Sequence, residues 1–264
     1  MIIKLYGVRG SLPAPMLNRD FRLRLKDVLT IAVEQNLKSM ADIDSFIDSL
    51  PDYLSFTTGG DTTCVTVKRD DELFILDAGT GIRALGDELL HGPAGQGKAV
   101  IHLLFTHTHW DHIQGIPFFK PLYIPGNEIH FYSPLPDLEE RLAYQTDDRF
   151  FPMPFHQTAS TKVFHQIKGE LQISHGLRID THPLKHPGGS FAYRFRSDGK
   201  TFIFATDVEF NGDDLLNRND HLDFFHDADL LILDAQYTLD ESFMKIDWGH
   251  TSYSMAVNCA VHWR

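Results

Sequence analysis

Short apolar runs that end in Gly, Asp or Pro recur along the whole chain and predict β-strands. Val, Ile, Leu and Phe dominate these runs. The predicted strands are Ile2–Val8, Thr62–Lys68, Leu73–Leu76, Val100–Phe105, Glu128–Tyr132, Leu177–Thr181, Phe191–Phe195, Thr201–Ala205 and Leu230–Leu233. The last run is uniformly apolar, which is typical of a strand that is buried on both faces.

Segments with helical periodicity lie between these strands. We predict four helices. The first is capped by Asn18 and has an apolar stripe of Phe21, Leu25, Val28, Leu29, Ala32 and Val33, and the second covers about Ala41–Leu50. The third is capped by Thr80, with Ile82, Leu85 and Leu89 turned inward, and the fourth covers Ser252–Trp263. Because strands and helices interleave throughout, we expect one α/β domain over residues 1–264, with sheets covered by helices.

The helical pair at about 18–50 is the one segment that has the character of an insertion. It lies between the first and the second predicted strand. One interpretation is a helical hairpin that covers a sheet edge. The other is a lid or a dimer contact.

Composition is compatible with a large core and with a reducing compartment. Apolar residues make up 42% of the 264 residues, which is too many for a disordered chain. No apolar stretch is long enough to span a membrane. The first residues read as a strand rather than as a signal peptide. Cys64 and Cys259 match no disulfide or metal spacing, so we expect a cytoplasmic protein.

Negative charge is concentrated toward the C-terminus. The net charge is −12, and residues 201–264 hold 12 acidic and 3 basic side chains, which is −9 of that total (3 − 12). Such a surface repels a long polyanion, which argues against nucleic acid as the main partner. A small anion that bound metal ions attract remains compatible with this charge.

Four side chains that commonly bind metals follow the predicted strand Val100–Phe105. His107, His109, Asp111 and His112 lie within six residues, at a strand end where the chain turns and where their side chains can converge. Imidazole and carboxylate together favour Zn²⁺, Mn²⁺ or Fe²⁺ over Ca²⁺ or Mg²⁺. A polar loop with chance histidines is the alternative, and four such residues at this spacing argue against it.

Two further residues occupy similar positions. His186 lies in a turn after one strand, and Asp207 directly follows Thr201–Ala205. Each alone is equally compatible with an ordinary turn residue. Together with the cluster they make six metal-binding side chains, and one metal ion needs only three or four. The sequence therefore predicts two divalent ions, with one bridging carboxylate and a hydroxide between the ions as the nucleophile.

Hydrolysis also requires a proton for the leaving oxygen. His250 lies in Trp248-Gly249-His250-Thr251-Ser252, a turn before a helix that Thr251 or Ser252 can cap. From position alone, a general acid and an ordinary loop histidine are equally compatible with this residue.

These residues resemble the metallo-β-lactamase superfamily, whose HxHxDH signature is complete at His107, His109, Asp111 and His112. The segments that resemble its phosphodiesterase branch, which includes ribonuclease Z and phosphoribosyl 1,2-cyclic phosphate phosphodiesterase, are Gly7-Val8-Arg9-Gly10-Ser11, Gly59-Gly60-Asp61-Thr62-Thr63-Cys64 and Asp77-Ala78-Gly79-Thr80-Gly81. Asp61 and Thr63 stand where that branch usually has Asn and Ser. The resemblance implies a four-layer αββα sandwich with the metals at one edge between two sheets.

The resemblance also implies a role for each site residue. The first metal would be held by His107, His109 and His186, the second by Asp111 and His112, with Asp207 as the bridge; His250 and Asp111 would be catalytic, and Asp77 and Asp234 would orient ligand imidazoles. In this branch a further histidine, after one more strand, completes the second site. This chain ends at Arg264, fourteen residues past His250 (264 − 250), so that strand and its histidine are absent from the sequence. Either the sequence stops short of them, or the second metal site has one ligand fewer and is expected to bind its ion more weakly.

We therefore predict a dinuclear metal-dependent hydrolase that cleaves a small or cyclic phosphodiester. The partners expected are a small anionic substrate and, because relatives commonly dimerise, a second copy of the chain, but neither nucleic acid nor a membrane. The alternatives are ribonuclease Z-like processing of tRNA 3′ ends, another hydrolase of the superfamily that acts on lactones or thioesters, and a non-catalytic metal-binding module.

Overall fold

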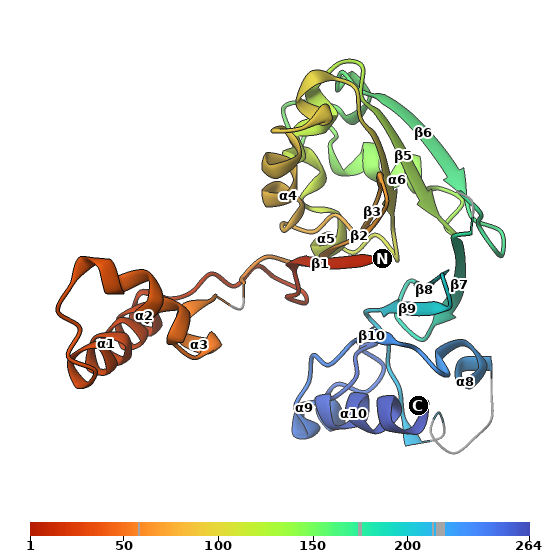
Figure 1. The fold of residues 1–264 in the computed structure, drawn as a ribbon. Helices are drawn as coiled ribbons and strands as arrows, with labels where there is room; N and C mark the ends of the chain where they lie inside the picture. Colours follow the sequence, from red (N-terminus) through yellow and green to blue (C-terminus); the bar gives the residue numbers. More distant parts are fainter. Residues whose placement is uncertain (58, 174–175, 213, 215–219) are drawn as a thin grey trace.

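Two β-sheets form the body of the protein (Figure 1). A computed structural model describes residues 1–57, 59–173, 176–212, 214 and 220–264. Within these ranges one sheet has six strands, in the order β1 (Ile2–Gly7), β2 (Cys64–Arg69), β3 (Glu72–Leu76), β4 (Val100–Leu104), β5 (Glu128–Ser133) and β6 (Thr161–Gln166). The other has four, in the order β10 (Leu230–Leu233), β9 (Lys200–Ala205), β8 (Ser190–Ser197) and β7 (Arg178–Leu184).

Strand direction brings the ends of several strands to one edge. The neighbours from β3 to β6 pair in parallel, and so do β9 and β10, whereas the other pairs are antiparallel. Loops that leave the carboxyl ends of parallel strands emerge side by side. The residues that follow β3, β4, β9 and β10 are therefore the ones that can assemble a site.

Helices cover the outer face of each sheet. The six-stranded sheet carries α4 (Ile82–Leu89), α5 (Trp110–Ile113), α6 (Leu138–Gln145) and the short 3₁₀ helices η2 (Pro93–Gln96), η3 (Ile116–Phe118), η4 (Lys120–Tyr123) and η5 (Phe155–Gln157). The four-stranded sheet carries α8 (Asp220–Phe225), α9 (Leu239–Met244) and α10 (Tyr253–His262).

Three apolar clusters separate these layers. One lies between the six-stranded sheet and its helices, and includes Phe131 and Leu142. A second lies between the sheets, where Phe74 meets Phe195. The third packs α10 on the smaller sheet through Trp263. The order helix, sheet, sheet, helix confirms the predicted α/β class and the αββα sandwich.

Several details of the predicted elements are wrong. Leu230–Leu233 is the edge strand of its sheet, and Leu230 is 43% exposed rather than buried on both faces. The strand β6 was not predicted, because only Val163 and Phe164 among its six residues are apolar. Asn18 is the first residue of its helix and forms no side-chain cap. Thr80 bonds Thr62 instead of capping α4. Ser252 does cap α10, since its hydroxyl accepts from the Met255 N–H.

The inserted helices form an arm that projects from the body (Figure 1). This arm consists of α1 (Asn18–Glu34), η1 (Met40–Asp42), α2 (Ile43–Ser49) and α3 (Asp52–Ser55). It has its own small core, in which Val28 and Ala32 of α1 pack on Phe46 and Leu50. The interpretation as a cover for a sheet edge is therefore wrong. No helix among the described residues has the length and apolarity that crossing a membrane would require.

Candidate metal centre

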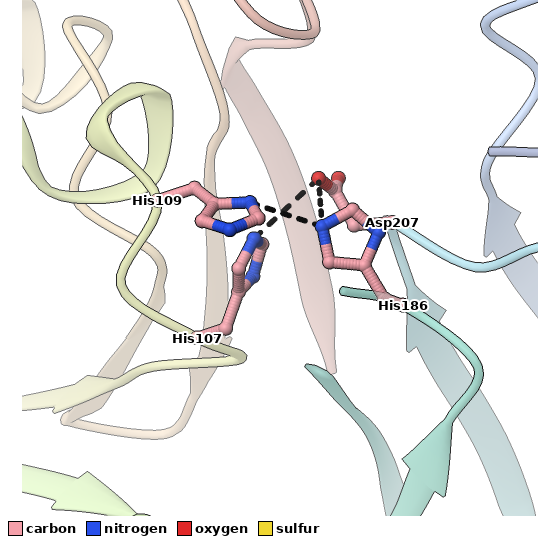
Figure 2. Close-up of side chains that lie close together, drawn as sticks. All are labelled: His107, His109, His186 and Asp207. Carbon is pink, nitrogen blue, oxygen red and sulfur yellow. Dashed lines mark hydrogen bonds and ion pairs between the residues drawn. The ribbon is translucent and has the colours of Figure 1, made fainter. Parts of the chain in front are cut away.

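The predicted ligands lie together at the edge where the two sheets meet. His107 and His109 lie in the loop that leaves β4, and Asp111 and His112 lie in α5 directly after it. His186 lies two residues past the end of β7, and Asp207 two residues past β9. Figure 2 shows His107, His109, His186 and Asp207 pointing toward one another from these separate segments. The structure thus brings together all six residues that the sequence singled out.

Four of these residues form one group. Their ligand atoms all lie within 4.8 Å of one another. His186 Nε2 lies 3.0 Å from His109 Nδ1 and 3.6 Å from Asp207 Oδ2. His107 Nε2 lies 3.5 Å from the same carboxylate oxygen. Three imidazole nitrogens and one carboxylate oxygen therefore converge on a single point.

A second group shares Asp207 with the first. His112 Nε2 lies 3.2 Å from Asp207 Oδ1 and 3.4 Å from Asp111 Oδ2. These ligand atoms also fall within 4.8 Å of one another. Because Asp207 offers Oδ2 to the first group and Oδ1 to the second, its carboxylate lies where a bridging ligand would lie.

The donor set fits divalent cations on two observations. His107 Nε2 and His112 Nε2 are buried and have no hydrogen-bond partner among the described residues. Leaving such an atom unsatisfied costs about 1–3 kcal/mol, which a ligand in the centre would offset. In a tetrahedral site with bonds of about 2.0–2.1 Å, neighbouring ligand atoms lie about 3.3–3.4 Å apart. The 3.0–3.6 Å separations that are observed bracket this value.

Hydrogen bonds behind the imidazoles fix their orientation. His112 Nδ1 lies 2.8 Å from Asp77 Oδ2, and the Asp77 carboxylate also accepts from the Thr106 N–H and hydroxyl. His186 Nδ1 donates to the Gly249 carbonyl at 2.8 Å. A proton held at Nδ1 leaves the Nε2 lone pair free to face the centre.

The electrostatics of the centre favour positive charge. Burial lowers the pKa of His107 well below its usual value, which keeps the ring in the neutral form that binds metals. Burial also opposes charge on His112, yet the Asp207 and Asp77 carboxylates hold its pKa well above the usual value. Burial likewise opposes charge on Asp207, but His112 and His107 hold the pKa of that carboxyl below its usual range. A buried pocket that stabilises a proton in this way is suited to a cation.

His250 lies beside the first group rather than in it. Its Nδ1 is 2.7 Å from Asp234 Oδ2, and its ring centroid is 5.2 Å from that of His186. His250, Asp234 and Asp207 have ligand atoms within 4.8 Å of one another. Asp234 also accepts from the Val208, Gln236 and Thr251 backbone N–H groups. The carboxylate is therefore fixed, and it fixes the imidazole.

Sequence reasoning missed several supporting residues. The Ser11 N–H donates to Asp111 Oδ2 at 2.7 Å, although Ser11 was noted only as part of a family motif. Thr106 contacts both Asp77 and the His107 ring. Gly249 adopts φ +84°, a conformation that favours glycine, with its carbonyl on His186. Two features of the sequence could have identified such residues. Thr106 is adjacent to the predicted ligand His107, and position 249 is a glycine directly before His250.

Three comparisons place this geometry among known proteins. A curated ribonuclease Z from Prochlorococcus marinus is 23% identical over 210 residues, which cover 60% of this chain and 65% of that protein. Human tRNase Z, short form, superposes with a TM-score of 0.61 at 16% identity over 99% of this chain and 88% of its own. A diphosphatase of the PhnP family superposes with a TM-score of 0.53 at 19% identity over 76% and 69%.

Both structural likenesses are below 25% identity and show the fold. The chain spans less than two thirds of the length of the curated relative that it matches. The family model described as the β-lactamase superfamily domain matches residues 73–264, which include all six predicted ligands. The chain therefore belongs to the metallo-β-lactamase superfamily.

Proposed function

We propose that this member of a hydrolase superfamily is a dinuclear-metal phosphodiesterase that cleaves a small or cyclic phosphodiester. The observation that supports it most is the position of Asp207, whose two oxygens face two separate groups of ligand atoms. The names of the relatives support the chemistry, since ribonuclease Z acts on RNA, a phosphodiester.

His107, His109 and His186 would hold the first ion, Asp111 and His112 the second, and Asp207 would bridge them. The donor set suits Zn²⁺, Mn²⁺ or Fe²⁺. Two such ions would supply an activated water and would neutralise the charge on the phosphodiester oxygens.

His250 would protonate the leaving oxygen from Nε2. Asp234 accepts the Nδ1 proton, which leaves Nε2 as the nitrogen that can transfer a proton, and His250 belongs to a group that also includes Asp207. The paired carboxylate also stabilises the imidazolium that must form before the proton is given up. Asp111 is the second proposed catalytic group, because the Ser11 N–H holds its carboxylate where it can take a proton from the attacking water.

The net charge of −12 supports a small substrate over a long polyanion. Processing of tRNA 3′ ends is the second candidate, because the curated relative and one structural neighbour carry that name. The compartment that we propose is the cytoplasm, which the two unpaired, buried cysteines Cys64 and Cys259 support.

The test is a substrate panel with metal analysis. Protein loaded with Zn²⁺ or Mn²⁺ is assayed on bis(p-nitrophenyl) phosphate, a 2′,3′-cyclic nucleotide, a lactone and a pre-tRNA. We expect cleavage of the first two and two metal ions per chain. Cleavage of the lactone alone would rule out a phosphodiesterase, and efficient cleavage of pre-tRNA alone would favour the second candidate.

A pair of histidine variants tests the proton donor. His250→Gln should lower kcat by about 10²–10⁴-fold, the usual contribution of general acid catalysis, with metal content unchanged. His91→Gln, at an exposed histidine outside the site, is the control. Loss of metal from the His250 variant would mean that this residue is a ligand.

A further inference from the structure

A cavity of about 570 Å³ lies beside the metal centre. Thr108 and Trp110, which flank His109 in the sequence, form one side of it, and Arg141, Tyr144 and Gln145 of α6 form another. Phe150 completes the rim. A space of this size accommodates a group no larger than a small organic ligand. A substrate that reaches the metals can therefore place one substituent here.

The rim of the cavity is aromatic and faces solvent. Trp110 is 81% exposed, and Tyr144 and Phe150 are also mostly exposed, with ring centroids 6.0 Å apart. Large aromatic side chains are seldom left so exposed together on a monomer surface without a binding role. Flat apolar faces of this kind bind other flat rings by stacking.

The floor of the cavity adds a directional polar group. Gln145 Nε2 donates to the Ile113 carbonyl at 3.0 Å. Because a carbonyl oxygen can only accept, this contact fixes the orientation of the amide. Gln145 Oε1 is then an acceptor that is buried and has no hydrogen-bond partner among the described residues. The Gln145 side chain also lines the cavity. Beside it, Arg141 Nη1 donates to Thr108 Oγ1 at 2.9 Å.

We propose that this cavity binds the heteroaromatic base of a nucleotidyl phosphodiester. A base offers a ring that can stack on Trp110 or Tyr144 and polar edge atoms that can hydrogen-bond with the Gln145 side chain, which lines the cavity. The proposal rests on the proposed function and specifies its substrate class. In the reaction, water forms a new bond to phosphorus and gives one proton to Asp111, the P–O bond to the leaving group breaks, and the proton on His250 passes to the leaving oxygen. The products are a nucleoside monophosphate and an alcohol.

Two substrates with the same leaving group test this specificity. They are adenosine 5′-(p-nitrophenyl phosphate), which carries a base, and methyl p-nitrophenyl phosphate, which does not. Stacking contributes about 1–3 kcal/mol per base, so we expect kcat/KM to favour the adenosine ester at least about fivefold. Trp110→Ala and Gln145→Ala should reduce this ratio, mainly through KM. Tyr53→Ala, an exposed tyrosine on the arm, is the control and should keep it.

Binding of AMP, measured by calorimetry on the metal-loaded protein, separates the two proposals. If both esters are cleaved with equal kcat/KM, the phosphodiesterase stands and the base site is wrong. If neither ester is cleaved but AMP binds and Trp110→Ala weakens it, the base site stands and the phosphodiesterase is wrong. If neither ester is cleaved and AMP does not bind, both proposals are overturned.

A second inference concerns the helical arm, and an independent observation carries it. The α1 helix has two apolar faces, of which Val28 and Ala32 occupy the one that packs on the arm core. The other bears Leu25, Leu29 and Val33, which are exposed and line a groove along the helix. A second apolar face that lies beside the packed one around the helix is typical of a helix with a second partner.

Charges along this groove are self-complementary. Arg22 and Lys26 line its first half, and Glu34 lines its end. In an antiparallel pair of α1 helices, Leu29 meets its own copy, Leu25 approaches Val33 of the second copy, and Arg22 approaches Glu34 of the second copy. A parallel pair would instead place like charges together. We therefore infer that the groove binds α1 of a second copy of this chain, in antiparallel orientation.

A charge swap tests this pairing by sedimentation over a range of protein concentrations. We expect a dimer, which Arg22→Glu and Glu34→Arg each weaken and which the double variant restores. Leu29→Glu should give a monomer with unchanged helix content by circular dichroism. Lys38→Glu, an exposed cation of the arm outside α1, is the control. A monomer at every concentration, or a dimer that these variants leave unchanged, would overturn the inference.

Discussion

The substitution Asp77→Asn should weaken one metal site selectively. Asp77 Oδ1 accepts from the Thr106 backbone N–H, which can only donate, so an asparagine must keep its oxygen there. Its NH₂ group then takes the place of Oδ2, opposite His112 Nδ1. Two donors face each other, and the ring is driven to the tautomer that carries its proton on Nε2. That is the atom that faces Asp111 and Asp207.

The expected magnitude follows from this geometry. Loss of a carboxylate behind a ligand histidine usually weakens metal binding by about 10–100-fold. Because the amide opposes the binding tautomer instead of merely failing to support it, we expect the upper end, about 100-fold or about 2.7 kcal/mol. Asp77 has φ +58°, a conformation that asparagine tolerates and alanine does not, so the backbone should be unaffected.

Titration of the metal-free protein with Zn²⁺ in competition with a chromogenic chelator measures this effect. The second binding event should shift by about two decades, whereas the first, on His107, His109 and His186, should shift little. Asp180→Asn, a largely buried carboxylate paired with arginines away from the site, is the control. A second-site dissociation constant within threefold of the parent value would refute the argument from the tautomer.

Three other predictions concern stability and metal binding. Burial lowers the pKa of His102 from 6.5 to about 4, so the folded state loses stability as the pH falls from 6.5 toward 4. The variant His102→Phe should remove about 2 kcal/mol of that loss at pH 5, which urea unfolding of the metal-free protein measures. Gly249→Ala should abolish binding of the first metal ion, because the alanine Cβ would collide with His186 Nδ1 and residue 249 has a positive φ. Full metal occupancy of this variant by elemental analysis would contradict the prediction. Ser252→Ala removes the cap on the Met255 N–H and should cost about 1 kcal/mol in thermal unfolding, whereas no change would show that the cap is dispensable.

The part of the site that sequence alone predicts is the part set by strand ends. His107, Asp207 and Asp234 each follow an apolar run, and apolar runs bounded by turns are strands. Parallel pairing of such strands brings their ends to one edge, so proximity follows from topology. The family signature then assigns which of these residues share an ion, and the observed groups have the same membership.

Local pattern does not reveal which surface an apolar stripe meets. Leu25 and Leu29 have the same period as Val28 and Ala32, yet only the latter pack on the arm core. The same limit applies to Leu230, whose apolar run belongs to an edge strand. The prediction that Thr80 caps a helix fails for a related reason, because its hydroxyl accepts from the backbone N–H of Thr62, which is distant in sequence.

The connection between the metal site and the proton donor is also tertiary. His186 donates from Nδ1 to the carbonyl of Gly249, the residue directly before His250. One short loop therefore orients a ligand of the first ion and also carries the imidazole that Asp234 fixes. The position of this loop and the orientation of the His186 ring are therefore coupled through one hydrogen bond. This arrangement gives a physical reason for glycine at position 249, where an added Cβ would collide with His186 Nδ1.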